Sequence, residues 1–252
     1  MEDKRILIVG TGTVAQAIAK RYLQDNCKVV FCDETQSKLD AALKNVPEAS
    51  TCIIEKFTDA DLVKNTITNL CDSIGNIDIF VYAVAYNKFK ALDVIAQSEM
   101  KEARYYGLDA PFVFGQQMGN IFAEKGVEGF LLYAFNDSCE GDDELDPVRC
   151  GCAYGLKGLI RSFALTYGPK KIIANGIAAG YLDTPEDKEY RSLIAKSLDM
   201  SSEEYEKKCL ATTLTGKLVD PMDVAEMCRF YTTEAVNISG QILLVDGGRQ
   251  MY

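Results

Sequence analysis

The stretch RILIVGTGTVA, from Arg5 to Ala15, decides the fold of this chain. Residues 5–10 form a continuous apolar run of the β type, and residues 14–24 have the character of a helix. Gly10, Gly12 and Ala15 match the pattern G-x-G-x-x-G/A, which requires a strand before it and a helix after it. We therefore predict a strand, a tight loop and a helix at the start of the chain.

The glycine loop has the chemistry of a phosphate-binding site. Gly10 permits the tight turn, Gly12 lets the backbone approach a pyrophosphate, and Ala15 lets the helix sit close to the strand. Free N–H groups and the helix dipole at the N-terminus of the following helix favour anions. The alternative is a loop that keeps its glycines only for backbone geometry.

The second predicted strand ends at Asp33, about 20 residues after the loop. A carboxylate there accepts hydrogen bonds from an adenosine ribose and repels a 2′-phosphate, which favours NAD over NADP. The candidate cofactor-binding residues are Gly10, Thr11, Gly12, Val14 and Asp33.

Apolar β-type runs alternate with helical stretches along the whole chain. The runs are residues 5–10, 28–32, 51–55, 77–83, 129–134, 172–177 and 241–245, and the helical stretches are 14–24, 38–44, 60–73, 98–124, 152–166 and 223–232. This alternation predicts a single α/β domain over residues 1–252 with a doubly wound, Rossmann-like parallel sheet. Residues 184–213 are polar and predict a small helical lid of two helices, the second capped by Ser201 or Ser202.

The composition excludes several classes of function. The net charge of −10 argues against nucleic acid and anionic membranes, and no apolar stretch approaches the roughly 20 residues that cross a bilayer. The absence of histidine removes Ser-His-Asp catalysis and most zinc sites, so we expect no metal. The nine scattered cysteines and the absence of a signal-peptide pattern predict a cytoplasmic protein. The close pair Cys150 and Cys152 is interpreted as buried thiols, with a metal or redox role as the alternative.

The whole chain resembles the short-chain dehydrogenase/reductase family. The segments 221–225 (PMDVA) and 239–248 (SGQILLVDGG) look like its last helix and strand, and 77–81 (IDIFV) looks like its fourth strand. Residues 108–113 (LDAPFV) look like the middle of its long interface helix. Ala179-Gly180 with Thr184 and Pro185 resembles the family's Pro-Gly…Thr loop beside the nicotinamide.

The resemblance implies a catalytic tetrad, and the matching positions hold other residues. In the family a Tyr moves a proton, a Lys four residues later lowers the pKa of that Tyr, a Ser positions the substrate oxygen and an Asn supports a water relay. The segment 161–164 (RSFA) anchors a gap-free alignment that puts Arg149 at the Tyr position and Ala153 at the Lys position. The Ser position falls on Asn136 and the helix Asn on Gly107. We therefore expect no catalytic residues at these places.

Two cofactor-contacting segments also depart from the family pattern, and a second alignment of the catalytic pair remains open. The Asn-Asn-Ala-Gly segment after the fourth strand reads YAVA at residues 82–85, and the adenine-contacting Asp is Lys56. NAD is the expected cofactor, and loss of NAD binding is the alternative. In the rival alignment Tyr154 and Lys157 are a displaced catalytic pair, since a spacing of three also leaves two side chains on one helix face. The alternative is that Tyr154 packs at a helix interface and Lys157 is solvated.

Arg149 cannot act as a base, because a guanidinium stays protonated. It could bind a carboxylate or phosphate, or pair locally with Asp142, Asp143 or Glu144. Of these interpretations we favour the local pair.

Three functions follow from these observations. The leading hypothesis is a non-catalytic subunit of a heteromeric NAD-dependent dehydrogenase, acting on a hydroxyacyl-CoA by analogy. It would pair with a homologous active subunit, or with itself, through residues 98–124 and 152–166. The alternatives are an active NAD-dependent oxidoreductase that uses Tyr154 and Lys157, and an NAD-sensing binding protein.

Overall fold

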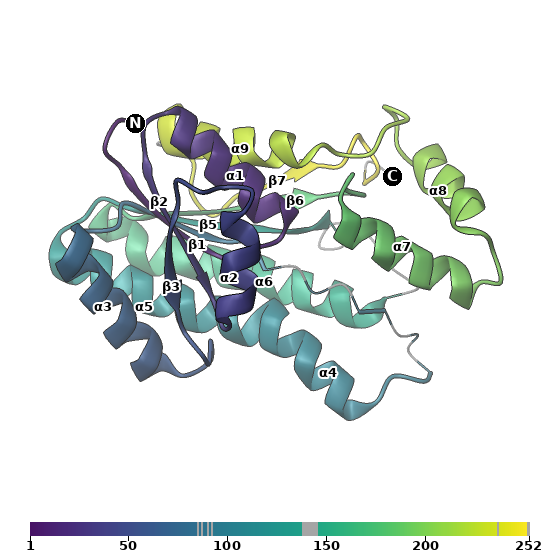
Figure 1. Cartoon of the computed structure of the whole chain (residues 1–252), viewed down its shortest axis with the longest axis horizontal. Coiled ribbons are helices and arrows are strands. Elements are labelled where there is room, and N and C mark those ends of the chain that lie inside the picture. The colour runs from purple at the N-terminus through teal and green to yellow at the C-terminus, as the bar shows by residue number, and fades with distance from the viewer. Residues whose placement is uncertain are drawn as a thin grey trace.

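The computed structural model describes residues 1–84, 86, 88–89, 91, 93–137, 146–235 and 237–250. In this part of the chain, parallel strands form one seven-stranded sheet in the order β3-β2-β1-β4-β5-β6-β7 (Figure 1). The strands are β1 (Arg5–Val9), β2 (Lys28–Asp33), β3 (Ser50–Ile53), β4 (Ile79–Tyr82), β5 (Phe130–Asn136), β6 (Ile173–Ala179) and β7 (Ile242–Val245). The doubly wound sheet predicted from the alternation of segments is therefore confirmed.

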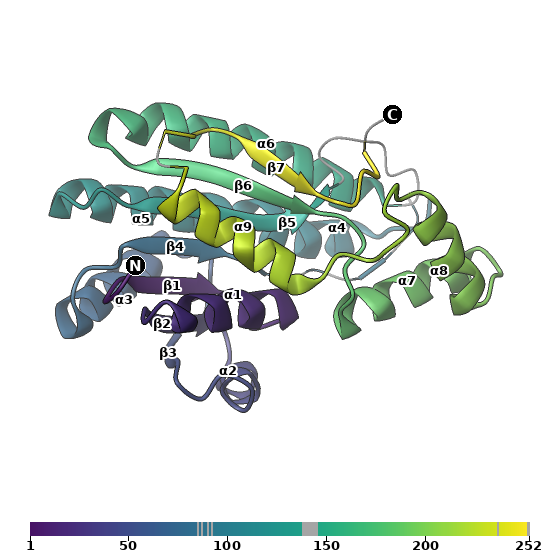
Figure 2. The ribbon, with the colours of Figure 1, turned by 90° about the horizontal axis from the view of Figure 1, so that it is seen from above.

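Helices cover both faces of the sheet (Figure 2). One face carries α1 (Thr13–Gln24), α2 (Gln36–Leu43) and α9 (Pro221–Thr233), and the other carries α3 (Ala60–Ile74), α5 (Ala110–Lys125) and α6 (Pro147–Tyr167). Alternate residues of β1 enter the two cores, Ile6 and Ile8 on the α1 side and Leu7 and Val9 on the α3 side. Burial on both faces explains why the strand is apolar from Ile6 to Val9 without alternation. Among the described residues, no helix is long and apolar enough to cross a membrane.

The long helix expected at 98–124 has a break in its middle. It consists of α4 (Gln97–Arg104), a π-helical turn η1 (Tyr105–Asp109) and α5. Pro111 has no N–H to donate to the carbonyl of Gly107 four residues earlier, so the regular α-helical ladder cannot continue through this turn. The break places Tyr105, Tyr106 and Gly107 at the carboxyl edge of the sheet.

Helix α6 begins at Pro147, five residues before the start expected from the sequence. Asp146 caps it by accepting the N–H of Arg149 at 2.9 Å, and Pro147 suits the first helical position. The extra turn brings Arg149 into the helix. Between β6 and α9, the helices α7 (Pro185–Ser197) and α8 (Ser202–Ala211) form the lid, and Ser201 caps α8 in a capping box with Glu204.

Candidate functional site

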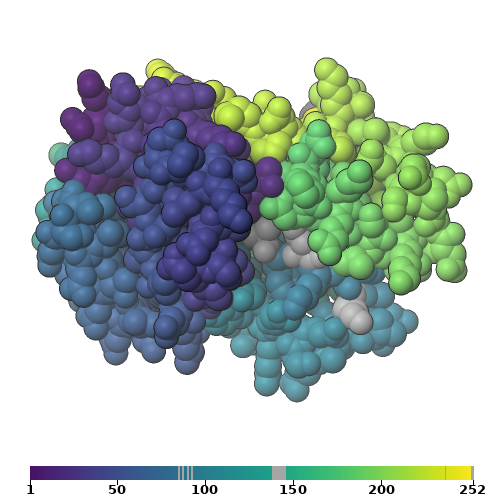
Figure 3. Space-filling model, viewed as in Figure 1, coloured from purple at the N-terminus to yellow at the C-terminus, as the bar shows by residue number. Residues whose placement is uncertain are grey.

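A pocket lies at the carboxyl ends of the central strands, where ligands bind in doubly wound sheets. It is bounded by the glycine loop, the ends of β4, β5 and β6, the turn η1, the start of α6 and the start of α7. In Figure 3 the surface is hollowed between the α1 and α2 region and the green lid. Gly107, Asn136, Arg149 and Ala153, the four positions matched to the family tetrad, all line this one pocket.

Gly107 allows η1 and α6 to approach closely. A Cβ atom added at Gly107 would lie 2.9 Å from the Cβ of Cys152, closer than two such carbons pack. An asparagine side chain does not fit there without movement of α6. The Cys152 thiol is directed to the carbonyl of Ala103 at 3.8 Å, and burial raises its pKa to about 11. This environment fits a structural thiol.

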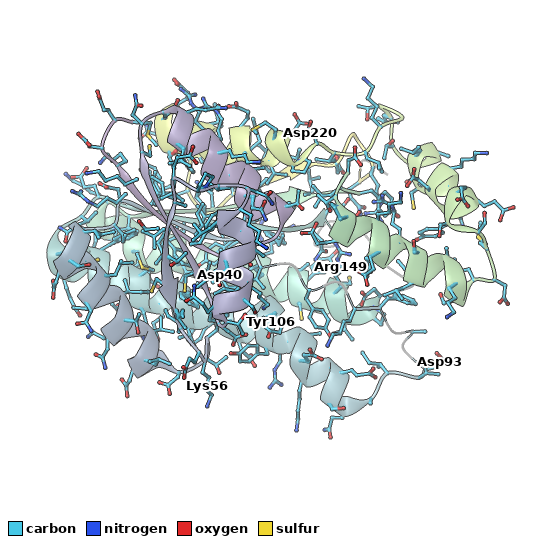
Figure 4. The ribbon with its side chains drawn as sticks, viewed as in Figure 1. Asp40, Lys56, Asp93, Tyr106, Arg149 and Asp220 are labelled. Atoms are coloured by element: carbon cyan, nitrogen blue, oxygen red, sulfur yellow. The ribbon has the colours of Figure 1, made fainter. Side chains whose placement is uncertain are left out.

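Arg149 is half-buried and places a cation at the position matched to the family tyrosine. Its guanidinium lies 4.0 Å from the carboxylate of Asp187 and 4.3 Å from the ring centre of Tyr190. Burial disfavours the charge, but Tyr190 and Asp187 outweigh it and raise the pKa of Arg149 above its ordinary value. The local partners considered above, Asp142, Asp143 and Glu144, lie outside the described residues. Figure 4 shows Arg149 between the α2 region and lid helix α7.

Ala153 and Asn136 complete the pocket wall. Ala153 is buried and packs against Ala178 of β6, so the position matched to the family lysine faces the sheet. Asn136 is half-buried at the last residue of β5, beside Ala179 of β6. A methyl group and an amide cannot exchange a proton near neutral pH.

Tyr154 and Lys157 lie on another face of α6. Tyr154 is 47% exposed and Lys157 is half-buried, and neither is among the described residues that line the pocket. The rotation of the helix explains the difference, because Ala153 and Leu156 point into the pocket and their next neighbours point away.

The glycine loop is in contact with the lid. The carboxylate of Glu186, in the first turn of α7, accepts the Thr13 N–H at 2.9 Å. The same carboxylate accepts the Thr13 hydroxyl, with distances of 3.0 Å and 2.8 Å to its two oxygens. The N-terminus of α1, where the motif would hold a pyrophosphate, thus carries a carboxylate of the chain itself.

Side chains also fill the region around the end of β2. The Asp33 carboxylate accepts the Thr11 hydroxyl at 2.9 Å and the Glu34 N–H at 2.8 Å, and it lies 3.1 Å from the Lys38 ammonium. Asp33 is therefore already surrounded by donors, although the sequence places it at the expected ribose position.

The carboxylate of Glu34 accepts the hydroxyl of Tyr105 and, at 2.9 Å, that of Tyr106. Tyr105 also accepts the N–H of Phe57, which follows exposed Lys56. Burial and Glu34 raise the pKa of Tyr105 to about 12. Tyr82 is buried beneath this group and donates to the carbonyl of Tyr106 at 2.7 Å. In Figure 4 Tyr106 lies in the middle of the molecule and Lys56 at its lower margin.

Known proteins match this chain along nearly its whole length. A family model described as enoyl-(acyl carrier protein) reductase matches residues 10–250. The chain belongs to the short-chain dehydrogenase/reductase family. The 7α-hydroxysteroid dehydrogenase of Bacteroides fragilis is 26% identical over 259 residues, covering 100% of this chain and 96% of that protein. A hydroxy(phenyl)methylsuccinyl-CoA dehydrogenase subunit of Thauera aromatica is 23% identical over 261 residues, covering 100% and 98%.

Solved structures of short-chain dehydrogenases/reductases share the fold. Actinorhodin polyketide ketoreductase, solved as a point variant with NADPH, superposes with a TM-score of 0.91 at 20% identity and 100% coverage of both chains. NAD⁺-bound xylitol dehydrogenase gives a TM-score of 0.91 at 17% identity, covering 98% of this chain and 99% of its own. The family is one of NAD(P)-dependent oxidoreductases, and these two neighbours hold the two forms of the nicotinamide cofactor.

In the arrangement observed, side chains of the chain itself occupy groups that a dinucleotide would contact. The Thr13 N–H that would face a pyrophosphate is taken by Glu186, and Tyr105 and Tyr106 close on Glu34. The backbone of the glycine loop keeps the form that the motif requires, with Gly10 at φ +111. A dinucleotide could enter only if these side chains moved.

The glycine loop can be located from the sequence, but the side chains that contact it and the end of β2 cannot. Glu186 reads as an ordinary acidic residue in the first turn of a helix, which is common because of the helix dipole. The sequence predicts Tyr105 and Tyr106 to lie within one continuous helix, and Glu34 belongs to no recognisable motif. These side chains meet because folding brings the start of α7 to the start of α1, and η1 to the residue that follows β2.

Proposed function

We propose that this chain is a non-catalytic, short-chain-dehydrogenase-like subunit of a heteromeric NAD-dependent dehydrogenase. The observation that carries the proposal is the pocket itself, lined by Arg149, Ala153, Asn136 and Gly107 at the positions matched to the family tetrad. Hydride transfer to or from a carbonyl needs a group that handles the hydroxyl proton, and such a group contributes roughly 10²–10⁴-fold to the rate. A permanently charged guanidinium cannot serve in that role.

The partner is a homologous subunit with an intact tetrad. The two helices expected to meet it, within residues 98–124 and 152–166, leave large apolar side chains in solvent: Met100, Phe112, Tyr154 and Leu165, which are 53%, 41%, 47% and 80% exposed. Large apolar side chains exposed on the helices that would face a partner support a protein–protein contact there. Tyr154 fits this surface better than it fits a catalytic role.

A hydroxyacyl-CoA is the proposed substrate class of the complex. One relative supports this class. The Thauera aromatica protein, which matches the full length of this chain, is named as a subunit of a hydroxy(phenyl)methylsuccinyl-CoA dehydrogenase. A second relative, from Thermotoga maritima, is named as a 3-oxoacyl-[acyl-carrier-protein] reductase and is 21% identical over 262 residues. Both names describe acyl thioesters whose acyl chain carries a hydroxyl or an oxo group.

The experiment is purification of the chain from its native host, followed by assay with 3-hydroxyacyl-CoA thioesters and NAD⁺. We expect the chain to elute with a second family member that carries Tyr-x-x-x-Lys, and we expect turnover from the pair but not from the chain alone. Turnover by the isolated chain that Tyr154→Phe abolishes would establish the displaced catalytic pair instead. NAD⁺ binding by the isolated chain without turnover would favour the sensor.

A further inference from the structure

The contact between Glu186 and the glycine loop joins two parts of the chain that are far apart in sequence. Both carboxylate oxygens of Glu186 face Thr13, and the backbone N–H and the side-chain hydroxyl of Thr13 both donate to it. A Cβ atom added at Gly12 would lie 3.3 Å from Glu186 Oε1, so the glycine backbone lies directly against the carboxylate. The carboxylate therefore sits in the loop as a bound anion would.

A carboxylate and a phosphate make the same demands on this loop. Each is an anion that accepts charge-assisted hydrogen bonds from backbone N–H groups, and each is stabilised by the positive end of a helix dipole. The first N–H of α1 can serve one such acceptor at a time. A diphosphate at the same place would also meet the negative charge of Glu186 at contact distance.

Hydrogen bonds around Glu186 order the start of α7. Its neighbour Asp187 is buried and accepts the Leu182 N–H at 3.0 Å, and Arg191 donates to the Leu182 carbonyl at 2.9 Å and to Asp187. Tyr190, on the same helix, donates to Asp146 at 2.8 Å and so ties α7 to the start of α6. Hydrogen bonds to the start of α1 and to the start of α6 therefore hold the lid in place.

We infer that Glu186 is an internal substitute for a diphosphate: it fills the anion site of the glycine loop and holds the lid closed when no nucleotide is bound. The site retains its affinity for a diphosphate group, but the chain's own carboxylate occupies it. The inference concerns only the loop and the lid, and it does not depend on the proposed subunit role.

Amide hydrogen exchange of the full-length chain tests this inference. In Glu186→Ala we expect the Thr13 amide to exchange about 10-fold faster, the effect of losing about 1.4 kcal/mol of charge-assisted hydrogen bonding. The amides of residues 186–197 should also exchange faster. Glu189→Ala, an exposed glutamate on the same helix, is the matched control and should leave both regions unchanged. Thr13→Ala removes the hydroxyl from the other side of the contact and should loosen 185–197 as well. Unchanged protection of 186–197 in both variants overturns the inference.

Inorganic pyrophosphate separates a substitute from a simple tether. Added to Glu186→Ala, it should restore slow exchange at Thr13, and added to the wild-type chain it should change nothing there. If pyrophosphate fails to protect Thr13 in the variant, Glu186 is only a tether and the inference is wrong. These readouts involve no turnover and no partner, so a failure of the subunit proposal leaves them unaffected.

Discussion

Gly107 and Cys152 bring the turn η1 and helix α6 so close that a Cβ on Gly107 would lie 2.9 Å from the Cβ of Cys152. This approach explains a departure from the family pattern in packing terms. The position matched to the relay asparagine is glycine because α6 occupies the space of the missing side chain. The close approach of η1 and α6 therefore shapes this side of the pocket.

Gly107→Ala should therefore destabilise the chain by about 1–3 kcal/mol, the usual cost of overpacking. Gly158→Ala is the matched control, because nothing lies within 4 Å of a Cβ added there. In the middle of α6 that change should stabilise by roughly 0.5–1 kcal/mol through helix propensity. Urea unfolding of the two variants measures both values. Equal effects of the same sign would contradict the close approach.

Tyr105→Phe should reduce the free energy of unfolding by about 1–2 kcal/mol, because the Phe57 N–H and the Glu34 carboxylate both lose their hydroxyl partner. Tyr154→Phe removes the same atom from a side chain that is 47% exposed, and we expect a change within about 0.5 kcal/mol. Thermal and urea unfolding of the pair measure the difference. A Tyr105→Phe chain as stable as the Tyr154→Phe chain would show that the cluster at Glu34 contributes nothing.

Arg149→Met should destabilise the chain by about 1–3 kcal/mol, because the buried Asp187 and the Tyr190 ring lose the cation beside them. The loss stays moderate since Arg191 still pairs with Asp187. Arg161→Met, at an exposed position of the same helix, is the control and should have little effect. Guanidinium chloride would screen the charges, so urea is the denaturant of choice. A neutral Arg149→Met would mean that the cation is held for a ligand or partner instead.

Asp25 predicts a pH dependence of stability. Partial burial raises the pKa of its carboxyl, but hydrogen bonds from Arg21 at 2.9 Å and Arg229 at 2.8 Å outweigh this and lower it below 3.8. A lowered folded-state pKa contributes stability that is present above the unfolded value and is lost as the pH falls through the folded value.

The difference in unfolding free energy between the wild-type chain and Asp25→Asn should thus be constant at neutral pH and shrink below pH 3.8. We expect it to be below about 1 kcal/mol, because the group is partly solvated. Asp3→Asn, with a carboxylate that is 80% exposed, is the control. A difference that grows on acidification would reverse the assigned sign.

Local patterns were sufficient to predict the sheet. Strand β1 is apolar from Ile6 to Val9 because both its faces are buried, and Gly10 and Gly12 mark the turn into α1, so the parallel fold could be inferred from short segments. The break at η1 could have been suspected from Pro111, but a proline in the first turn of a helix looks the same as one that follows a π-helical turn.

The sequence by itself determined the fold and the glycine loop, because these depend on periodicity and on spacing along one or two neighbouring segments. Only the tertiary structure decided what fills the cleft. Glu186 and Thr13 are 173 positions apart, and Glu34 and Tyr105 are 71 apart. Such pairs meet only when the lid and the long helix have packed on the sheet, and no local pattern records which side chain will then face the loop.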